Sequence, residues 1–209
     1  MCRIGGMSSG FINAGFIPLL LNDKDKTCCN TLQKNSPNIQ VIWEDISKID
    51  LSQYKNCTDV LVADLPCQSF STAGNRGGLE SSPGNLVYEF IWLVKEVNPR
   101  VFLLENVRGL LSIQKGQIFQ MLIELLRVND KYNVYHKLLN ALHYGVPQKR
   151  ERIFLVGVRN DIAELYEFPL PLNRTILLRD VFLGCPPSPG YEYPQWKREI
   201  MDRIPEGGC

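Results

Sequence analysis

Two side chains that can do chemistry lie where apolar runs of the sequence end. Cys67 follows an apolar run that ends near Ala63. A cysteine in a loop after a strand is a nucleophile when its thiolate is stabilised, and otherwise an inert, partly buried thiol. Glu105 ends a second apolar run. Burial there raises the pKa of its carboxyl group, so Glu105 can act as a general acid near neutral pH, the alternative being a helix-capping or solvated glutamate.

A pair of arginines precedes a third apolar run. Arg150 and Arg152 are separated by one residue just before the run 153–158. An extended segment projects both side chains to the same side, where two guanidinium groups can clamp a phosphate or carbonyl oxygens. The alternatives are structural ion pairing or a solvated basic face, because the net charge of the whole chain is only +1.

Strand-like and helix-like runs alternate along the chain, and they must position these residues. Continuous apolar runs are typical of strands in a sheet that is covered on both faces. We expect four such strands, at residues 41–43, 59–64, 100–105 and 153–158. We also expect two apolar helices, at residues 86–94 and 118–126. This alternation predicts an α/β fold with a mostly parallel sheet and helices on both faces, whose reactive groups gather at the carboxyl ends of the strands.

The composition excludes several other classes of protein. With 44% hydrophobic and 22% charged residues among 209, wholesale disorder is not expected. No apolar run reaches the roughly 18 residues that a membrane span needs, and the first residues lack the apolar core of a signal peptide. Seven cysteines without C-x-x-C spacing, and two histidines, argue against a metal site or a disulfide framework. We therefore expect this protein to reside in a reducing cytoplasm.

The order and spacing of these residues, together with short flanking motifs, resemble the cytosine-5 DNA methyltransferase family. The resemblance extends from residue 1 to about residue 160. The segments that carry it are Gly5-Gly6, Pro66-Cys67-Gln68, Phe70-Ser71-x-x-Gly74, Gly84-Asn85-Leu86, Glu105-Asn106-Val107, Tyr144-Gly145-Val146-Pro147 and Gln148-x-Arg150-x-Arg152. The resemblance implies a Rossmann-like fold that uses S-adenosylmethionine, in a bacterial restriction–modification or phage setting.

The resemblance also implies a reaction and a role for each candidate catalytic residue. Such enzymes rotate a target cytosine out of double-stranded DNA into the active site. Cys67 would attack C6 of the flipped base as a thiolate, and Glu105 would hydrogen-bond or protonate N3. C5 would then take the methyl group, and β-elimination would free the enzyme. Arg150 and Arg152 would orient the base and stabilise the anionic side of the pocket.

Further residues are implied to hold the cofactor and the DNA. Gly5 and Gly6 would let the backbone approach the methionine moiety of S-adenosylmethionine. Asp23 would accept the ribose hydroxyls. The implied adenine contacts and pocket-lining residues are Asp45, Ile46, Pro66 and Leu86, and the implied DNA contacts are Gln68, Ser71, Gln148 and Arg150. No metal ligands are implied.

This sequence departs from the family pattern at three places. The family opens its cofactor loop with an aspartate-containing strand and Phe-x-Gly-x-Gly, whereas Arg3 stands here at the first glycine. The catalytic loop of the family reads Gly-Pro-Pro-Cys, and here it is Asp64-Leu65-Pro66-Cys67. The family continues into a target-recognition domain and two closing motifs. We therefore expect residues 1–168 to be an N-terminally clipped catalytic domain, with the Pro-rich tail 169–209 leading to an absent target-recognition region.

Two alternatives to an active DNA methyltransferase follow from the same residues. In the first, the chain is a non-catalytic truncated fragment, or one subunit of a split methyltransferase, that binds DNA or a partner polypeptide. In the second, it is an RNA cytosine methyltransferase. For the DNA enzyme we expect a bacterial cytoplasmic protein associated with the nucleoid, with double-stranded DNA as its partner and with no membrane and no metal.

Overall fold

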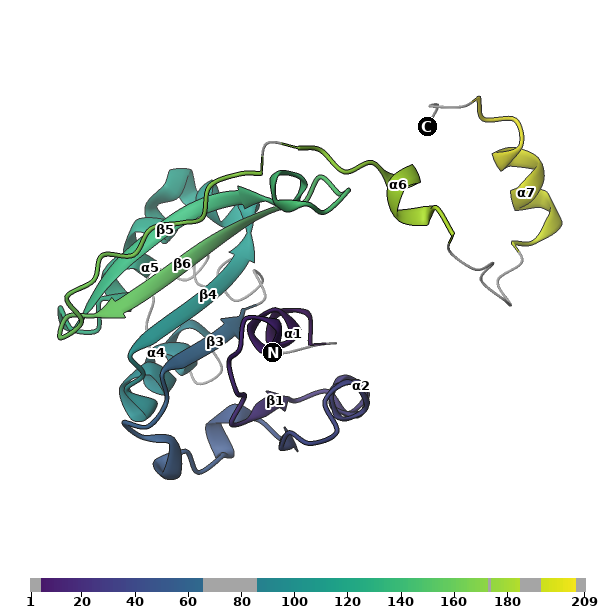
Figure 1. Ribbon diagram of the computed structural model, residues 1–209. Helices are drawn as coiled ribbons and strands as arrows, with labels where there is room; N and C mark the ends of the chain where they lie inside the picture. Colours follow the sequence, from purple (N-terminus) through teal and green to yellow (C-terminus); the bar gives the residue numbers. More distant parts are fainter. Residues whose placement is uncertain (1–4, 66–85, 173, 185–192, 206–209) are drawn as a thin grey trace.

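The computed structural model describes residues 5–65, 86–172, 174–184 and 193–205. Within these residues the strands form two sheets (Figure 1). A two-stranded sheet pairs β1 with β2, and a four-stranded sheet has the order β3-β4-β6-β5. The strands are β1 (Leu21–Asp23), β2 (Val41–Trp43), β3 (Val60–Asp64), β4 (Val101–Val107), β5 (Tyr132–Asn140) and β6 (Glu151–Arg159).

The strand directions are mixed. β1 is parallel to β2, and β3 is parallel to β4, as the α/β pattern predicts. β6, in contrast, runs antiparallel to both of its neighbours, β4 and β5. The sheet is therefore less parallel than the sequence suggested. The reason is the short connection between β5 and β6, residues 141–150, because a parallel crossover needs a dozen or more residues.

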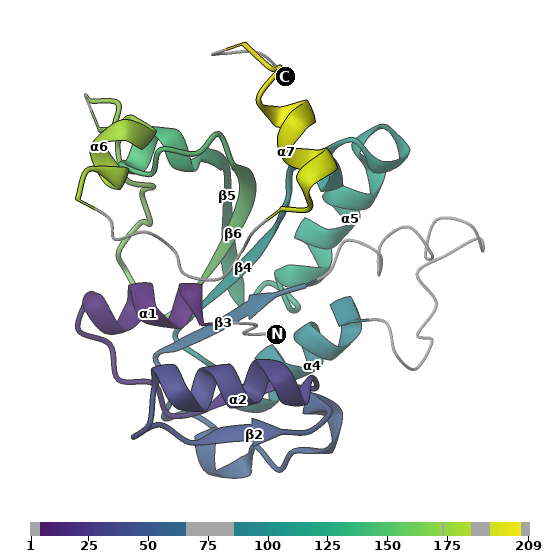
Figure 2. The same ribbon diagram turned by 90° about the vertical axis from the view of Figure 1, so that its right-hand side faces the viewer.

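Helices flank the sheets, and α4 and α5 follow the apolar spacing of the sequence. They are α1 (Gly6–Asn13), α2 (Lys26–Asn35), α4 (Leu86–Val97), α5 (Gln117–Leu126), α6 (Leu178–Phe182) and α7 (Gln195–Met201). Short 3₁₀ helices in the described parts of the chain cover residues 46–48, 52–54, 108–111, 113–116 and 141–144. The two views place α4 and α5 on one face of the four-stranded sheet and α1 on the other (Figures 1 and 2). The helices predicted at 86–94 and 118–126 are thus confirmed.

Local chemistry accounts for the start of α2. The Asp25 carboxylate accepts hydrogen bonds from the backbone N–H groups of Thr27 and Cys28, at 2.7 and 3.1 Å. An aspartate at this position satisfies amides that have no partner in the first turn of a helix. These two bonds hold the pKa of Asp25 below its ordinary value.

The hydrophobic core lies between the four-stranded sheet and helices α4 and α5. Phe102 of β4 is fully buried and packs edge-to-face against Phe90 of α4, with ring centroids 5.6 Å apart. Tyr132 of β5 lies on its other side, 5.2 Å between centroids, and its hydroxyl donates to the Pro99 carbonyl at 2.8 Å. Burial raises the pKa of Tyr132 to about 12. This aromatic row therefore ties α4, β4 and β5 together.

The segment after β6 returns along the sheet before it leaves it. The Tyr144 hydroxyl donates to the Pro169 carbonyl at 3.1 Å, and the Leu172 amide donates to the His143 carbonyl at 2.8 Å. Beyond these contacts α6 and α7 extend away from the sheet (Figure 1). Large apolar side chains in this extension are exposed, among them Phe182, Leu183 and Trp196. No helix in the described parts of the chain is long and apolar enough to cross a membrane.

We expect Gly157→Ala to lower the free energy of unfolding by about 1–3 kcal/mol, the usual cost of overpacking a core. Gly157 of β6 lies opposite Phe102, and an added Cβ would lie 2.1 Å from that buried ring. Urea denaturation followed by circular dichroism measures the change. The matched control is Gly10→Ala within α1, where an added Cβ has no atom within 4 Å and a gain of about 0.5–1 kcal/mol is expected. Equal stabilities of the two variants would contradict this packing.

Candidate active site

One edge of the four-stranded sheet gathers the candidate catalytic residues. Asp64 ends β3, and Glu105 lies near the carboxyl end of β4 as its direct partner in the strand register. Because β6 runs antiparallel, its first residues, including Arg152, start at this same edge. The sequence predicted that Glu105 and Arg152 belong to one site. The topology brings them together although β5 and α5 separate them along the chain.

The Glu105 carboxylate and the Arg152 guanidinium form an ion pair. Nε of Arg152 lies 2.8 Å from Oε1 of Glu105, and the two side chains are 22% and 12% exposed, respectively. A second guanidinium nitrogen of Arg152 donates to the backbone carbonyl of Glu151 at 2.8 Å. The Glu151 carboxylate in turn pairs with Arg108 at 2.7 Å. These contacts fix the direction of the Arg152 side chain, so Arg152 makes the structural ion pair that the sequence left open as an alternative.

The environment of Glu105 favours its protonated form. Its pKa is raised above the ordinary value of a glutamate, chiefly because burial removes the carboxylate from water. The negative charge of Asp64, and a hydrogen bond between the two carboxyl groups, raise it further. The positive charges of Arg152 and Arg150 act in the opposite direction. Burial at the strand end therefore has the effect on Glu105 that the sequence predicted.

Asn106 organises the backbone at this edge, a role that the sequence did not reveal. Its side chain is 1% exposed, and its Nδ2 donates to the Leu65 carbonyl at 2.9 Å. Its Oδ1 accepts from the Val107 amide, also at 2.9 Å. Leu65 is the last described residue before the segment that carries Cys67. The buried amide thus anchors the chain at the point where that segment begins.

Gln148 and Arg150 lie on the connection between β5 and β6, and both are exposed. The Arg150 carbonyl accepts a hydrogen bond from the Ala141 amide at 2.9 Å, which closes this connection. The charge of Arg150 is close enough to act on the pKa of Glu105. The two arginines thus differ, because Arg152 is held by Glu105 whereas Arg150 faces solvent.

Several predicted site residues cannot be located in the structure. Pro66, Cys67, Gln68 and Ser71 lie outside the described residues, as does Arg3. Leu86 opens α4, but its side chain lies outside them too. Their roles therefore remain predictions that rest on the resemblance.

Among the predicted cofactor-binding residues, Gly5 has a backbone conformation that requires glycine. It precedes α1 with φ near +88°, a conformation that side chains other than glycine rarely adopt. An added Cβ would also lie 3.0 Å from Leu32 and 3.1 Å from the Ser8 hydroxyl. Gly6, in contrast, has open space around the position of a Cβ. Gly5 has no side chain that could cap α1, so within the described residues the N-cap position leaves amides of the first turn to a ligand.

The two predicted cofactor carboxylates lie in different surroundings. Asp23 ends β1, is 3% exposed and accepts a hydrogen bond from the Asp25 amide at 3.0 Å. Asp45 caps the 3₁₀ helix 46–48 through the backbone amide and hydroxyl of Ser47. These hydrogen bonds lower the pKa of Asp45. Ile46 packs against the hydrophobic core, so the segment around Asp45 is held in place on both sides.

The amide groups and the carboxylate described above match the polar groups of S-adenosylmethionine. A helix start without a cap offers amide donors, Gly6 leaves space beside them, and Asp23 offers a carboxylate at the carboxyl end of β1. Ligands of α/β sheets bind at such strand ends. Among the described residues there is no cluster of three or more side chains that could hold a metal ion.

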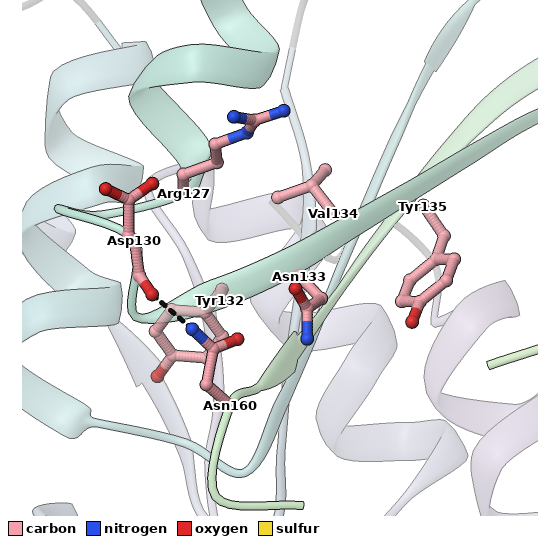
Figure 3. Close-up of a pocket in the computed structure, with 7 residues that line it drawn as sticks. All are labelled: Arg127, Asp130, Tyr132, Asn133, Val134, Tyr135 and Asn160. Carbon is pink, nitrogen blue, oxygen red and sulfur yellow. Dashed lines mark hydrogen bonds between the residues drawn. The ribbon is translucent and has the colours of Figure 1, made fainter. Parts of the chain in front are cut away.

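A surface pocket lies at the opposite end of the sheet (Figure 3). It is lined by residues just after α5, at the start of β5 and just after β6, among them Arg127, Tyr132 and Asn160, respectively. The Asn160 side chain donates to the Asp130 carbonyl, which holds the two segments together. None of the predicted site residues lines this pocket, so it is separate from the candidate active site.

Comparison with known proteins identifies the class of the fold. A solved structure described as a DNA modification methyltransferase encoded within an Escherichia coli prophage matches with a TM-score of 0.71 and 26% identity, over 88% of this chain and 53% of that one. A DNMT2 mutant from Spodoptera frugiperda has a TM-score of 0.63 at 20% identity, over 84% of this chain and 52% of that one, which supports the fold alone. The fold is that of the Rossmann-like α/β methyltransferases.

The sequence comparisons then give the family. The family described as C-5 cytosine-specific DNA methylase matches residues 1–194, and this chain belongs to it. The type II methyltransferase M.Eco47II of Escherichia coli is 40% identical over 214 residues, 98% of this chain and 51% of the relative. M.AquIA, a type II methyltransferase of Picosynechococcus, is 38% identical over 183 residues, 81% of this chain and 73% of the relative. The chain spans about half the length of M.Eco47II.

We expect Asn106→Ala to lower the free energy of unfolding by about 1–3 kcal/mol, because it leaves the buried Leu65 carbonyl without its donor. Thermal or urea denaturation measures the loss. Asn133→Ala is the control, since Asn133 is exposed on β5 and its removal is expected to change stability by no more than about 0.5 kcal/mol. If Asn106→Ala proved as mild as Asn133→Ala, Asn106 would not anchor this part of the chain.

Proposed function

We propose that this chain forms the cofactor-binding and catalytic part of a DNA (cytosine-5-)-methyltransferase in a bacterial restriction–modification system. The observation that carries the proposal is the largely buried Glu105 carboxyl group, held by Arg152 at the strand edge and raised in pKa, in a chain of this family. Addition of a thiolate to a cytosine ring requires a group that can give a proton to the base, and the raised pKa of Glu105 suits it to this role. The site of this reaction in bacteria is the cytoplasm, at the nucleoid.

The chemistry begins with the need to activate cytosine. C5 of the ring is a poor nucleophile, and addition of the Cys67 thiolate to C6 makes it electron-rich. A proton from Glu105 to N3 of the base draws negative charge off the ring during that addition. C5 then takes the methyl group, and water accepts the C5 proton as the bond to Cys67 breaks, which restores the aromatic ring.

In this proposal Arg152 and Arg150 form no covalent bond to the substrate; they stabilise negative charge in the site. The ion pair with Arg152 orients the Glu105 carboxyl group, and its planar guanidinium suits this contact. When Glu105 gives up its proton, the two guanidinium groups stabilise the carboxylate that remains. Arg150 is exposed, so it is also free to contact the base or a DNA phosphate.

S-adenosylmethionine, when bound, supplies an electrophilic methyl group. The first turn of α1 after Gly5 and Gly6 would bind its methionine moiety, and Asp23 would bind its ribose hydroxyls. Asp45 and Ile46 would contact the adenine, and Pro66 and Leu86 would line the same pocket. In this proposal the capping bonds from Ser47 serve to hold the Asp45 segment in position.

The DNA substrate must present its base outside the duplex, because a stacked cytosine cannot reach Cys67. We propose that Gln68, Ser71, Gln148 and Arg150 contact the DNA around the flipped base. M.Eco47II is about twice as long as the region that matches this chain. We propose that the part of such an enzyme that recognises the DNA target, on the same or a second polypeptide, corresponds to the half of M.Eco47II that does not match this chain.

The cofactor part of this proposal is tested by calorimetric titration of the chain with S-adenosylhomocysteine, which needs no knowledge of the DNA target. We expect saturable micromolar binding. Asp23→Asn keeps a side-chain oxygen for the Asp25 amide but removes the charge, and it is expected to weaken binding about tenfold, or about 1.4 kcal/mol. Asp59→Asn is the control, because Asp59 is an exposed carboxylate just before β3, at the end of that strand away from the candidate site. Absence of binding by the folded chain would contradict the cofactor assignment.

The role of Cys67 is tested by methyl transfer from radiolabelled S-adenosylmethionine to unmethylated genomic DNA, which contains every short target sequence. Cys67→Ser is expected to reduce transfer at least about a hundredfold, because a serine hydroxyl is not ionised near neutral pH. The same variant should bind S-adenosylhomocysteine as tightly as the unaltered chain. Cys57→Ser, at an exposed free thiol, should leave both measurements unchanged. Transfer retained by Cys67→Ser would exclude this cysteine as the nucleophile.

A further inference from the structure

Glu105 has two charged neighbours on opposite sides of its strand. On the β6 side the Arg152 guanidinium lies 2.8 Å from its Oε1. On the β3 side Asp64 is its direct register partner in a parallel pair of strands. Neighbouring strands are about 4.8 Å apart, and paired residues of a parallel ladder project to the same face. The order β3-β4-β6 thus places Glu105 between a carboxylate and a guanidinium.

The closeness of the two carboxyl groups favours a shared proton. Asp64 and Glu105 are register partners on neighbouring parallel strands, and the nearby carboxyl group of Asp64 raises the pKa of Glu105. Two ionised carboxylates have only acceptor oxygens, so a hydrogen bond can join them only when one of them carries a proton. With one proton the pair has a charge of −1, and Arg152 balances it. A neutral group of this kind is the favoured state at a site where Glu105 is largely buried.

Asp64 is a specific feature of this sequence. It stands where the family pattern has glycine in the loop that leads to the cysteine. Glycine has no side chain that could share a proton with the carboxyl group of Glu105. Asp64 ends β3 only three residues before Cys67, so its carboxyl group belongs to the edge of the sheet at which the proposed reaction takes place.

We propose that Asp64 is a positioning residue that shares a proton with Glu105 and so keeps Glu105 ready to protonate the cytosine ring. The charged groups that face Glu105 from the elements around it are Asp64 from β3, Arg152 from β6 and Arg150 from the preceding connection. Asp64 is the one among them that favours the protonated form of Glu105. This inference rests on the proposed function, since it supplies the proton that the addition step uses.

The proton balance of that step is closed. As a lone pair of Cys67 Sγ forms the bond to C6, the π electrons of the ring shift through C5 and C4 onto N3. N3 takes the proton from Glu105, which leaves the Asp64–Glu105 pair with a charge of −2. Arg152 and Arg150 then balance this charge. The proton returns from N3 to the pair after the Sγ–C6 bond has broken, so one turnover leaves the pair unchanged.

The proposal is tested by the titration of Glu105 in the chain without DNA or cofactor. Side-chain carboxyl carbons of ¹³C-glutamate-labelled protein are followed by NMR over pH, and the signal missing in Glu105→Gln identifies Glu105. We expect its titration midpoint to move to lower pH in Asp64→Asn, which removes the charge and nearly preserves the shape. Asp59→Asn, which removes an exposed carboxylate paired with Arg100 before β3, should leave the midpoint in place.

An unchanged midpoint in Asp64→Asn would overturn the proposal, and so would a wild-type midpoint in the ordinary range of glutamate. Asp64→Gly, the residue of the family pattern, takes the place of Asp64→Asn if that variant does not fold. In methyl transfer, the decline of activity at high pH should also begin at lower pH in Asp64→Asn, because Glu105 loses its proton sooner. The titration does not depend on turnover, so the NMR result decides the role of Asp64 by itself, whereas a folded chain that fails to bind S-adenosylhomocysteine would count against the proposed function.

Discussion

The ion pair between Glu105 and Arg152 is the interaction on which the candidate site depends. It joins the ends of two strands at a largely buried position, where an unpaired charge would be costly. The antiparallel course of β6 is what makes it available, because a parallel strand would start at the opposite edge of the sheet. The direction of one strand thus decides whether this site has a guanidinium group.

Much of the fold could be predicted from the sequence because its central elements are continuously apolar. β2, β3, β4 and β6 and helices α4 and α5 were all expected, close to their observed bounds. β5 was not, because it lies at the end of the sheet and carries exposed polar residues such as His136 and Lys137. β1 was not expected either, because only Leu21 of its three residues is apolar, whereas all three residues of β2 are apolar.

The candidate site was predictable only in part, for a related reason. Glu105 and Arg152 are recognisable by residue type and by the family spacing. The contributions of Asp64 and Asn106 depend on which residues face each other across β3 and β4. That register is a tertiary property, and no short-range pattern encodes it. The charge of Asp64 and the buried amide of Asn106 therefore acquire meaning only once the two strands are paired.

The two kinds of strand connection have a consequence for the order in which the chain folds. β5 and β6 are joined by a short segment, so their pairing closes a small loop at low entropic cost. β4 reaches β6 only across α5 and β5, and β3 reaches β4 across α4. Long-range pairings of this kind are slow to form. The β5–β6 ribbon is thus expected to be an early folding unit, whereas the edge that carries Glu105 is completed late, when β4 docks onto the preformed ribbon.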